Sequence, residues 1–250
     1  MPRWPSLPVL VLASCVVSTA SAQVLAPPAS PRSGEDADIQ DRDSTDSRRT
    51  NIKGAIQDSL RLLIIEHAVR VGTQAKTREG LKGPFFADYH RSVVMPSQWG
   101  DGDSWYTNYV GHPGQGAASG FIWLQNSSYG QMPFALTHEY LGSRLRAMAW
   151  ATGYSVQFEV GPFSEASIGN VGMNRKTVGW VDYIATPAGG FGIMIAEDLL
   201  DRFVVQRLEA RTDSRVVRGM LRMFLNPSRA AANVAGLRAP WYRIGRPIAN

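Results

Sequence analysis

The chain of 250 residues has a single cysteine, Cys15, which lies near its N-terminus. If the first segment is removed as a leader, the remaining chain has no thiol, which excludes disulfides, thiol nucleophiles and cysteine-ligated metals. Charge is also missing over a long stretch. No Asp, Glu, Lys or Arg occurs from Ser104 to His138, although these four residue types make up 19% of the chain. This pattern predicts charge-poor helices that lie at a lipid boundary.

The signatures of several enzyme classes are absent as well. His138 and Glu139 are not followed by a second histidine at zincin spacing. The chain has no GxSxG serine motif, and the glycines at 189–192 lack the strand–turn–helix context of a nucleotide loop. From these patterns we predict no metal site and no cofactor.

The N-terminal residues have the features of an export signal. Arg3 precedes an apolar stretch at 7–17, and Ala20-Ser21-Ala22 has the small-x-small pattern that a signal peptidase accepts. Residues 1–22 are therefore predicted to be a signal peptide, and the mature protein is expected in the periplasm or in a cell-envelope membrane. In the alternative interpretation, a lipobox ends at Cys15, and the mature chain is a lipoprotein.

The rest of the chain divides by composition. Residues 23–50 are rich in Pro, Ser and Asp, and they are predicted to form a disordered linker because they bury too little apolar surface. From Asn51 onward, apolar residues recur at three- and four-residue spacing. We therefore predict an all-α fold, a bundle of five to seven helices over residues 51–226 that is membrane-embedded or membrane-associated. Residues 227–250 are expected to form an irregular basic tail.

Polar side chains are spaced so that they share one face on each of two expected helices, one near residues 108–126 and one from Val178 onward. A carboxylate such as Asp182 in so apolar a helix is costly unless it is paired or protonated. The residues of these stripes and of the segment between them are Asn108, His112, Gln115, Ser119, Glu159, Glu165, Asp182, Thr186, Pro187, Gly189 and Gly190.

Two functions are compatible with these stripes. In the first, an exported envelope protein binds lipid or an envelope partner through a polar groove. In the alternative, the protein is a hydrolase or transferase that acts on a lipid-linked or glycan substrate. The candidate catalytic residues are then His112 as general acid or base, and Glu165 or Asp182 as the group that orients it or shares its proton. Nucleic acid is not an expected partner of an exported chain, and the oligomeric state stays open.

The C-terminal part is basic and amphipathic. From Asp213 onward, apolar residues alternate with arginines at helical spacing. Such a helix suits an anionic lipid surface, and the alternative is a solvated helix packed on a soluble core. The arginines expected at the membrane surface are Arg211, Arg215, Arg218 and Arg222.

Three segments taken in order carry a resemblance. NYVGHPGQG at 108–116, EVGPFSEASIGN at 159–170 and VDYIATPAGG at 181–190 resemble the VanZ-like and YfiM-like families of bacterial envelope proteins. The resemblance covers residues 105–200 and implies a small helical membrane or membrane-associated fold, without an established chemistry. The matching positions are His112, Glu165, Asp182, Thr186, Pro187, Gly189 and Gly190.

Overall fold

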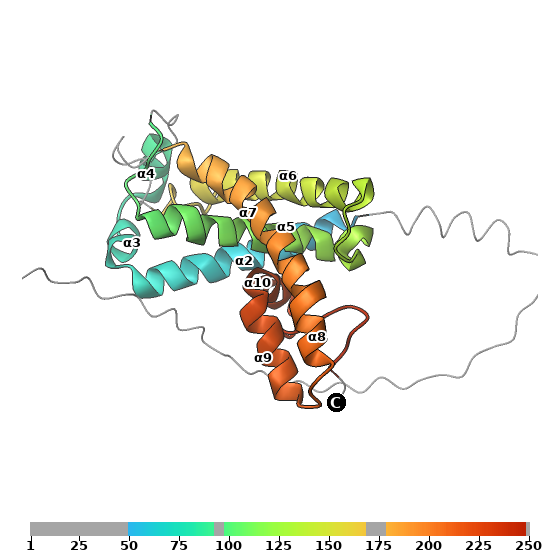
Figure 1. Cartoon of the computed structure of the whole chain (residues 1–250). Helices are drawn as coiled ribbons and strands as arrows, with labels where there is room; N and C mark the ends of the chain where they lie inside the picture. The colour runs from blue at the N-terminus through green and yellow to red at the C-terminus, as the bar shows by residue number, and fades with distance from the viewer. Residues whose placement is uncertain (1–49, 93–97, 169–178, 249–250) are drawn as a thin grey trace, which may run out of the picture. The chain divides into compact units, whose positions relative to one another are not determined.

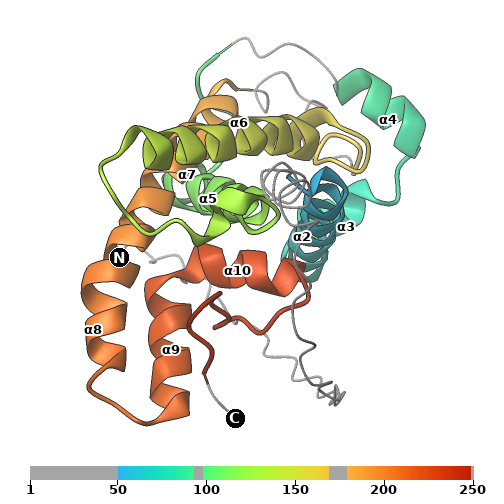
Figure 2. The same cartoon turned by 90° about the vertical axis from the view of Figure 1, so that its right-hand side faces the viewer.

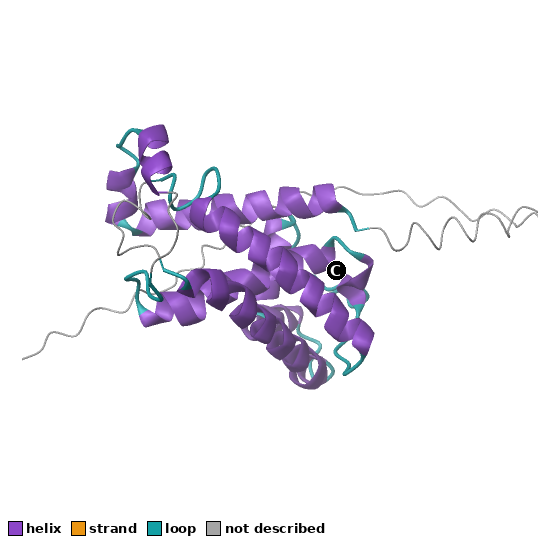
Figure 3. Cartoon of the chain, turned by 90° about the horizontal axis from the view of Figure 1, so that it is seen from above, coloured by secondary structure: helices purple, strands orange, loops and turns teal. Residues whose placement is uncertain are grey.

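The computed structural model describes residues 50–92, 98–168 and 179–248, which belong to one compact unit of the chain. Within these ranges the regular elements are helices, joined by loops and one isolated bridge between Gln98 and Gly179, as Figure 3 shows. The predicted all-α class is confirmed. The predicted signal peptide and all but the last residue of the predicted linker lie outside the described residues.

Three of the described helices begin at residues whose side chains cap free backbone N–H groups. Asn51 accepts from Gly54, and Ser214 accepts from Val217. In chain order the elements are α2 (Ile52–Thr73), α3 (Ala75–Gly80), α4 (Phe85–Ser92), the π-helical turn η1 (Thr107–Gly111), α5 (His112–Gln125), the 3-10 turn η2 (Ser128–Gln131), α6 (His138–Val160), α7 (Val181–Leu200), the π-helical turn η4 (Asp201–Val205), α8 (Gln206–Glu209), α9 (Arg215–Leu225) and α10 (Pro227–Ala235).

Helix α5 is the centre of the fold. It packs against α7, α6, α10 and α2, and Figure 2 shows it between α6 on one side and α10 on the other. Most of its residues are buried, including Phe121, Ile122 and Leu124. Within α5, contact with other helices therefore accounts for the missing charge. In the described ranges no helix is both long and apolar enough to cross a bilayer.

The closest packing joins α5 to α7 through glycines, which let two helix backbones approach each other. A Cβ on Gly190 would lie 2.6 Å from the carbonyl carbon of Gly116, and a Cβ on Gly120 would lie 2.5 Å from the sulfur of Met194. At Gly190 the opposing atoms are backbone, so a side chain there would hold the two helices apart, whereas at Gly120 the end of the Met194 side chain would have to move. The crossing at Gly116 and Gly190 brings the N-terminal ends of α5 and α7 together, and the polar stripes meet at these ends.

Helix α7 continues through η4 into α8, and α9 then runs back beside it (Figure 1). The irregular tail predicted from residue 227 is wrong in its first part, because α10 begins there and packs on α5 and α2. The carboxylate of Glu197 accepts hydrogen bonds from the backbone N–H groups of Ser228 (2.8 Å) and Arg229 (3.1 Å). Pro227 at the first turn has no N–H to satisfy. Tertiary contact with α7 therefore supplies the cap that the local sequence lacks.

Candidate metal centre

Three helix ends bring an imidazole and two carboxylates together. His112 is the first residue of α5, Glu159 is the last but one of α6, and Asp182 is the second of α7. One ligand atom from each of the three lies within 4.8 Å of the other two. His112 Nε2 and Asp182 Oδ1 are 3.5 Å apart. The side chains of all three are buried, with exposed fractions of 6%, 3% and 3%.

The orientation of His112 can be derived from its neighbours. Its Nδ1 lies 3.1 Å from Gln115 Oε1, while the Nε2 of Gln115 donates to Glu66. Since an amide oxygen only accepts, Nδ1 carries the proton and donates to it. In the neutral ring the Nε2 atom then has a free lone pair, which is directed toward Asp182. The Gln115–Glu66 pair thus holds the imidazole in the tautomer that suits a metal ligand.

The facing carboxylate oxygens have no donor. Glu159 Oε1 and Asp182 Oδ1 are buried and lack a hydrogen-bond partner, as do the nearby Asn108 Oδ1 and Thr186 Oγ1. Buried polar atoms without partners cost free energy, and a buried unpaired charge costs considerably more. A nitrogen lone pair and two carboxylate oxygens that face one another need positive charge between them, either protons or a metal cation.

Burial dominates the protonation of the two acids. It raises the pKa of Asp182 to about 9, and the nearby Glu159 and Asp101 contribute to this rise. It raises the pKa of Glu159 to about 8, although the charge of Arg70 opposes the shift. Burial also lowers the pKa of His112. Without a metal the acids keep their protons at neutral pH, and a divalent cation would displace these protons on binding.

Asp101 connects the cluster to the surface. It accepts a hydrogen bond from Asn108 Nδ2 at 2.8 Å and is also hydrogen-bonded to Asp182. Burial opposes its ionisation, but the hydrogen bonds from Asp182, Asn108 and backbone amides outweigh burial and lower its pKa. An ionised Asp101 and a protonated Asp182 therefore share a proton. The backbone around the Gln98 bridge fixes this segment, because Val181 N–H donates to the carbonyl of Trp99 at 2.9 Å.

The cluster suits a divalent transition metal. Imidazole nitrogen together with carboxylate oxygen is a donor set that Zn²⁺, Mn²⁺ and Fe²⁺ accept, whereas Ca²⁺ and Mg²⁺ prefer oxygen alone. Three protein ligands leave at least one coordination position for water, which is the arrangement of catalytic rather than structural zinc sites. The expectation of no metal site was drawn from missing motifs, and a group contributed by three separate helices has no such motif.

Glu165 does not join the three ligands. It pairs with Arg70 of α2, whose guanidinium also lies 5.8 Å from the centre of the Phe158 ring. Glu159 takes the place that the sequence interpretation gave to Glu165, because it lies at the end of α6 whereas Glu165 lies in the turn beyond it. Asp101 was missed altogether, since its sequence context, a glycine-rich turn, carries no spacing signal.

The other residues of the predicted stripes have structural roles. Ser119 donates to the carbonyl of Gly116 at 3.0 Å within α5. Pro187 lies inside α7, and Gly189 approaches the ring of Pro113. Gly190 forms the crossing with α5. Gly189 and Gly190 lie where α7 approaches α5 most closely, and so they help to set the positions of His112 and Asp182 on the two helices.

The arginines expected at a membrane surface separate into two groups. Arg211 and Arg215 are exposed, and Arg218 is half-buried and lies 3.6 Å from Asp213. The expectation for Arg222 is wrong, because it is buried (3% exposed) and forms an ion pair with Glu209.

No family model matches the chain, and neither a curated protein nor a solved structure matches it significantly. The resemblance to VanZ-like and YfiM-like proteins therefore stays a prediction.

Proposed function

We propose that this protein is an exported cell-envelope hydrolase whose centre is one divalent transition-metal ion bound by His112, Glu159 and Asp182. The observation that carries the proposal is the convergence of three buried acceptor atoms within 4.8 Å, two of them without any hydrogen-bond donor. In a non-catalytic role, in which these residues lock the helices, the protons that the two acids carry without a metal would supply the donors. A bound cation satisfies all three at once.

Asp101 supplies the remaining element of hydrolysis. A divalent cation lowers the pKa of its bound water and so generates hydroxide near neutral pH. Asp101 is ionised and half-buried, and it lies beside Asp182. Once the proton of Asp182 is displaced by the metal, Asp101 is free to accept one from the attacking water as general base. The substrate class we propose is an ester or glycosidic group carried by an envelope lipid, in line with the basic amphipathic helix α9.

Metal binding is the first test. The full-length protein is stripped with a chelator and titrated with Zn²⁺ or Mn²⁺ by calorimetry, with elemental analysis of the product. We expect one ion per chain and at least about a tenfold loss of affinity in His112→Gln and in Asp182→Asn, since each loses a ligand. The control is His138→Gln, which makes the same exchange at an exposed position. Folded wild-type protein that takes up no cation would refute the proposal.

Hydrolysis is tested separately with the metal-loaded protein and chromogenic esters, phosphoesters and glycosides. Asp101→Asn should retain the metal and lose turnover, because Asp101 is not among the three ligands. If Asp101→Asn and wild type are equally active on a cleaved substrate, Asp101 is not the base. Metal binding without turnover on any of these substrates would leave a binding protein and would contradict the enzymatic part of the proposal.

A second candidate function, binding to an anionic lipid surface, is favoured by α9. Val216 and Phe224 are 70% and 68% exposed, and the helix also presents Arg215 to solvent. Exposed apolar groups next to cations are the features of helices that lie in a membrane interface. Co-sedimentation with phosphatidylglycerol vesicles tests this function. Phe224→Asp should abolish binding, and equal binding to neutral phosphatidylcholine vesicles would argue against an anionic surface.

A further inference from the structure

A second polar site lies at the opposite end of α7 from the metal centre. The rise from Asp182 to Asp198 along this helix is about 24 Å, so the two sites are independent. A cavity of about 230 Å³ opens here between the end of α5, the loop after η2, the α7–η4 segment, α10 and the C-terminal residues. The arginines that line it are Arg202, Arg229, Arg238, Arg243 and Arg246.

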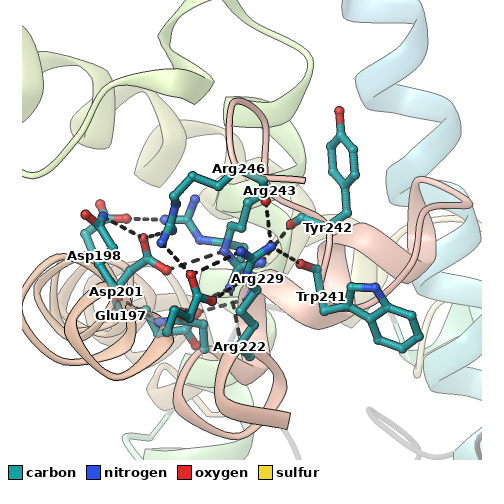
Figure 4. A network of polar contacts seen from close by, with 12 residues as sticks. Glu197, Asp198, Asp201, Arg222, Arg229, Trp241, Tyr242, Arg243 and Arg246 are labelled. Carbon is teal, nitrogen blue, oxygen red and sulfur yellow. Dashed lines mark hydrogen bonds and ion pairs between the residues drawn. The ribbon is translucent and has the colours of Figure 1, made fainter. Parts of the chain in front are cut away.

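The cavity has an excess of positive charge. Its five arginines are accompanied by only two acids, Asp198 and Asp201, which leaves a net charge of +3. Both acids already have arginine partners, although Asp201 Oδ1 makes no hydrogen bond, and Arg246 pairs in addition with Glu209 outside the lining. Asp198 accepts from Arg144 and Tyr140 as well as from Arg229, and Asp201 pairs with Arg246. Figure 4 labels Asp198 and Asp201 together with Arg229 and Arg246, the cavity arginines that pair with them. The acids of the cavity cannot neutralise the remaining arginines.

Two of the arginines have buried donors without acceptors. Arg229 Nε and Arg243 Nε make no hydrogen bond, although both are shielded from water. Arg243 is 5% exposed, and its Nε lies 3.5 Å from Asp201 Oδ1. Burial and the neighbouring Arg229, Arg222 and Arg246 together lower its pKa to about 9, with Asp201 opposing them. Additional negative charge nearby would stabilise the Arg243 guanidinium against these neighbouring cations.

The remaining arginines have neutral partners. Arg238 donates to Gln125 Oε1 at 3.2 Å, and Arg202 donates to the carbonyl of Phe134. Neither has a carboxylate partner among the described contacts that line the cavity. Both are less buried than Arg243, so each can redirect a guanidinium N–H to a bound anion without breaking an ion pair.

We propose that this cavity binds a phosphate group, either as inorganic phosphate or as the phosphomonoester of a lipid headgroup. Arginine guanidinium groups match phosphate oxygens with paired donors, and a dianion offsets most of the net charge of the cavity. Phosphate fills only part of the volume. Phe134, Tyr242 and Ile244, which also line the cavity, offer contacts for an organic substituent. The site does not depend on the metal centre, and it binds its ligand whether or not that centre is catalytic.

Calorimetric titration of the full-length protein with sodium phosphate tests the proposal, at constant ionic strength and with metal chelated. We expect saturable binding of one phosphate per chain and about tenfold weaker binding in Arg238→Gln and in Arg202→Gln, since each removes one charge-assisted donor. The matched control is Arg146→Gln, which removes one exposed positive charge outside the cavity. It should bind phosphate like the wild type.

Two results would overturn the proposal. One is the absence of saturable phosphate binding to the folded wild-type protein. The other is an equal loss of affinity in Arg238→Gln and Arg146→Gln, which would show that net charge, and not the cavity, attracts the anion. Glycerol phosphate distinguishes the two sources of the ligand. Binding tighter than that of inorganic phosphate supports a lipid headgroup, and weaker binding supports free phosphate.

Discussion

The crossing of α5 and α7 makes a sharp prediction about Gly190. A Cβ at this position would lie 2.6 Å from the carbonyl carbon of Gly116 and 2.7 Å from the backbone nitrogen of Ala117. Real Cβ contacts essentially never fall below 3.0 Å. Because the opposing atoms belong to the backbone of a buried helix, no side chain can rotate away. In Gly190→Ala the two helices must therefore separate.

The magnitude follows from two opposing effects. Alanine in place of glycine in a helix interior stabilises by about 1 kcal/mol. Forcing an extra methyl group into a packed crossing costs about 1–3 kcal/mol. We expect Gly190→Ala to lower the free energy of unfolding by up to about 2 kcal/mol. In a domain of this size each kcal/mol corresponds to roughly 2–4 °C in melting temperature.

The control is on the same helix. Gly192 is exposed, and a Cβ there would meet nothing within 4 Å, so Gly192→Ala should be neutral or stabilise by up to about 1 kcal/mol. Urea unfolding followed by circular dichroism measures both variants. Separation of the helices should also weaken metal binding, because His112 and Asp182 lie on the two helices that move. If Gly190→Ala is as stable as Gly192→Ala, the close crossing is wrong.

Two further predictions concern buried charges. Burial raises the pKa of Glu66 to about 7, despite hydrogen bonds from Tyr154 and Gln115, so the folded state holds a proton that the unfolded state releases above pH 4.5. The free energy of unfolding should therefore fall as pH rises from 4.5 to 7. In urea unfolding of the metal-free protein, Glu66→Gln should remove up to about 3 kcal/mol of this fall. Parallel pH profiles of the variant and the wild type would disprove the raised pKa of Glu66. Arg144 is 1% exposed and donates to Asp198 at 2.8 Å. In the same assay, Arg144→Met should lower the free energy of unfolding by about 3–5 kcal/mol. The control Arg146→Met, on the exposed face of the same helix, should lower it by less than about 1 kcal/mol. Similar losses in the two arginine variants would contradict a buried ion pair.

Several features of the fold could be predicted from spacing alone. The helical period from Asn51 predicted α2, and the clustered polar residues predicted which faces of α5 and α7 turn inward. Periodicity is a local property, so it identifies a helix without its partners. Within α2 it did not identify the buried side, since Leu62 and Leu63 are buried whereas Ile56, Leu60 and Ile64 are about half exposed or more.

Other features depended on contacts between distant residues. The charge-poor stretch around α5 suggested a lipid boundary, yet the helix is surrounded by other helices, and local composition does not distinguish these two apolar environments. The start of α10 was missed because its cap, Glu197, lies on α7. Arg222 has the spacing of a surface residue, but it is buried in an ion pair with Glu209 of the preceding helix.

The sequence by itself determined that the described residues form helices, because helical periodicity and capping act within a few residues of one another. It also identified His112 and Asp182 as candidates, since polar groups on apolar helices are costly without a partner. Only the tertiary structure decided that Glu159 rather than Glu165 completes the cluster and that Asp101 joins it. That choice depends on where three helix ends meet, and the meeting point is set by the glycine crossing of α5 and α7, which brings residues far apart in the chain to within ligand distance.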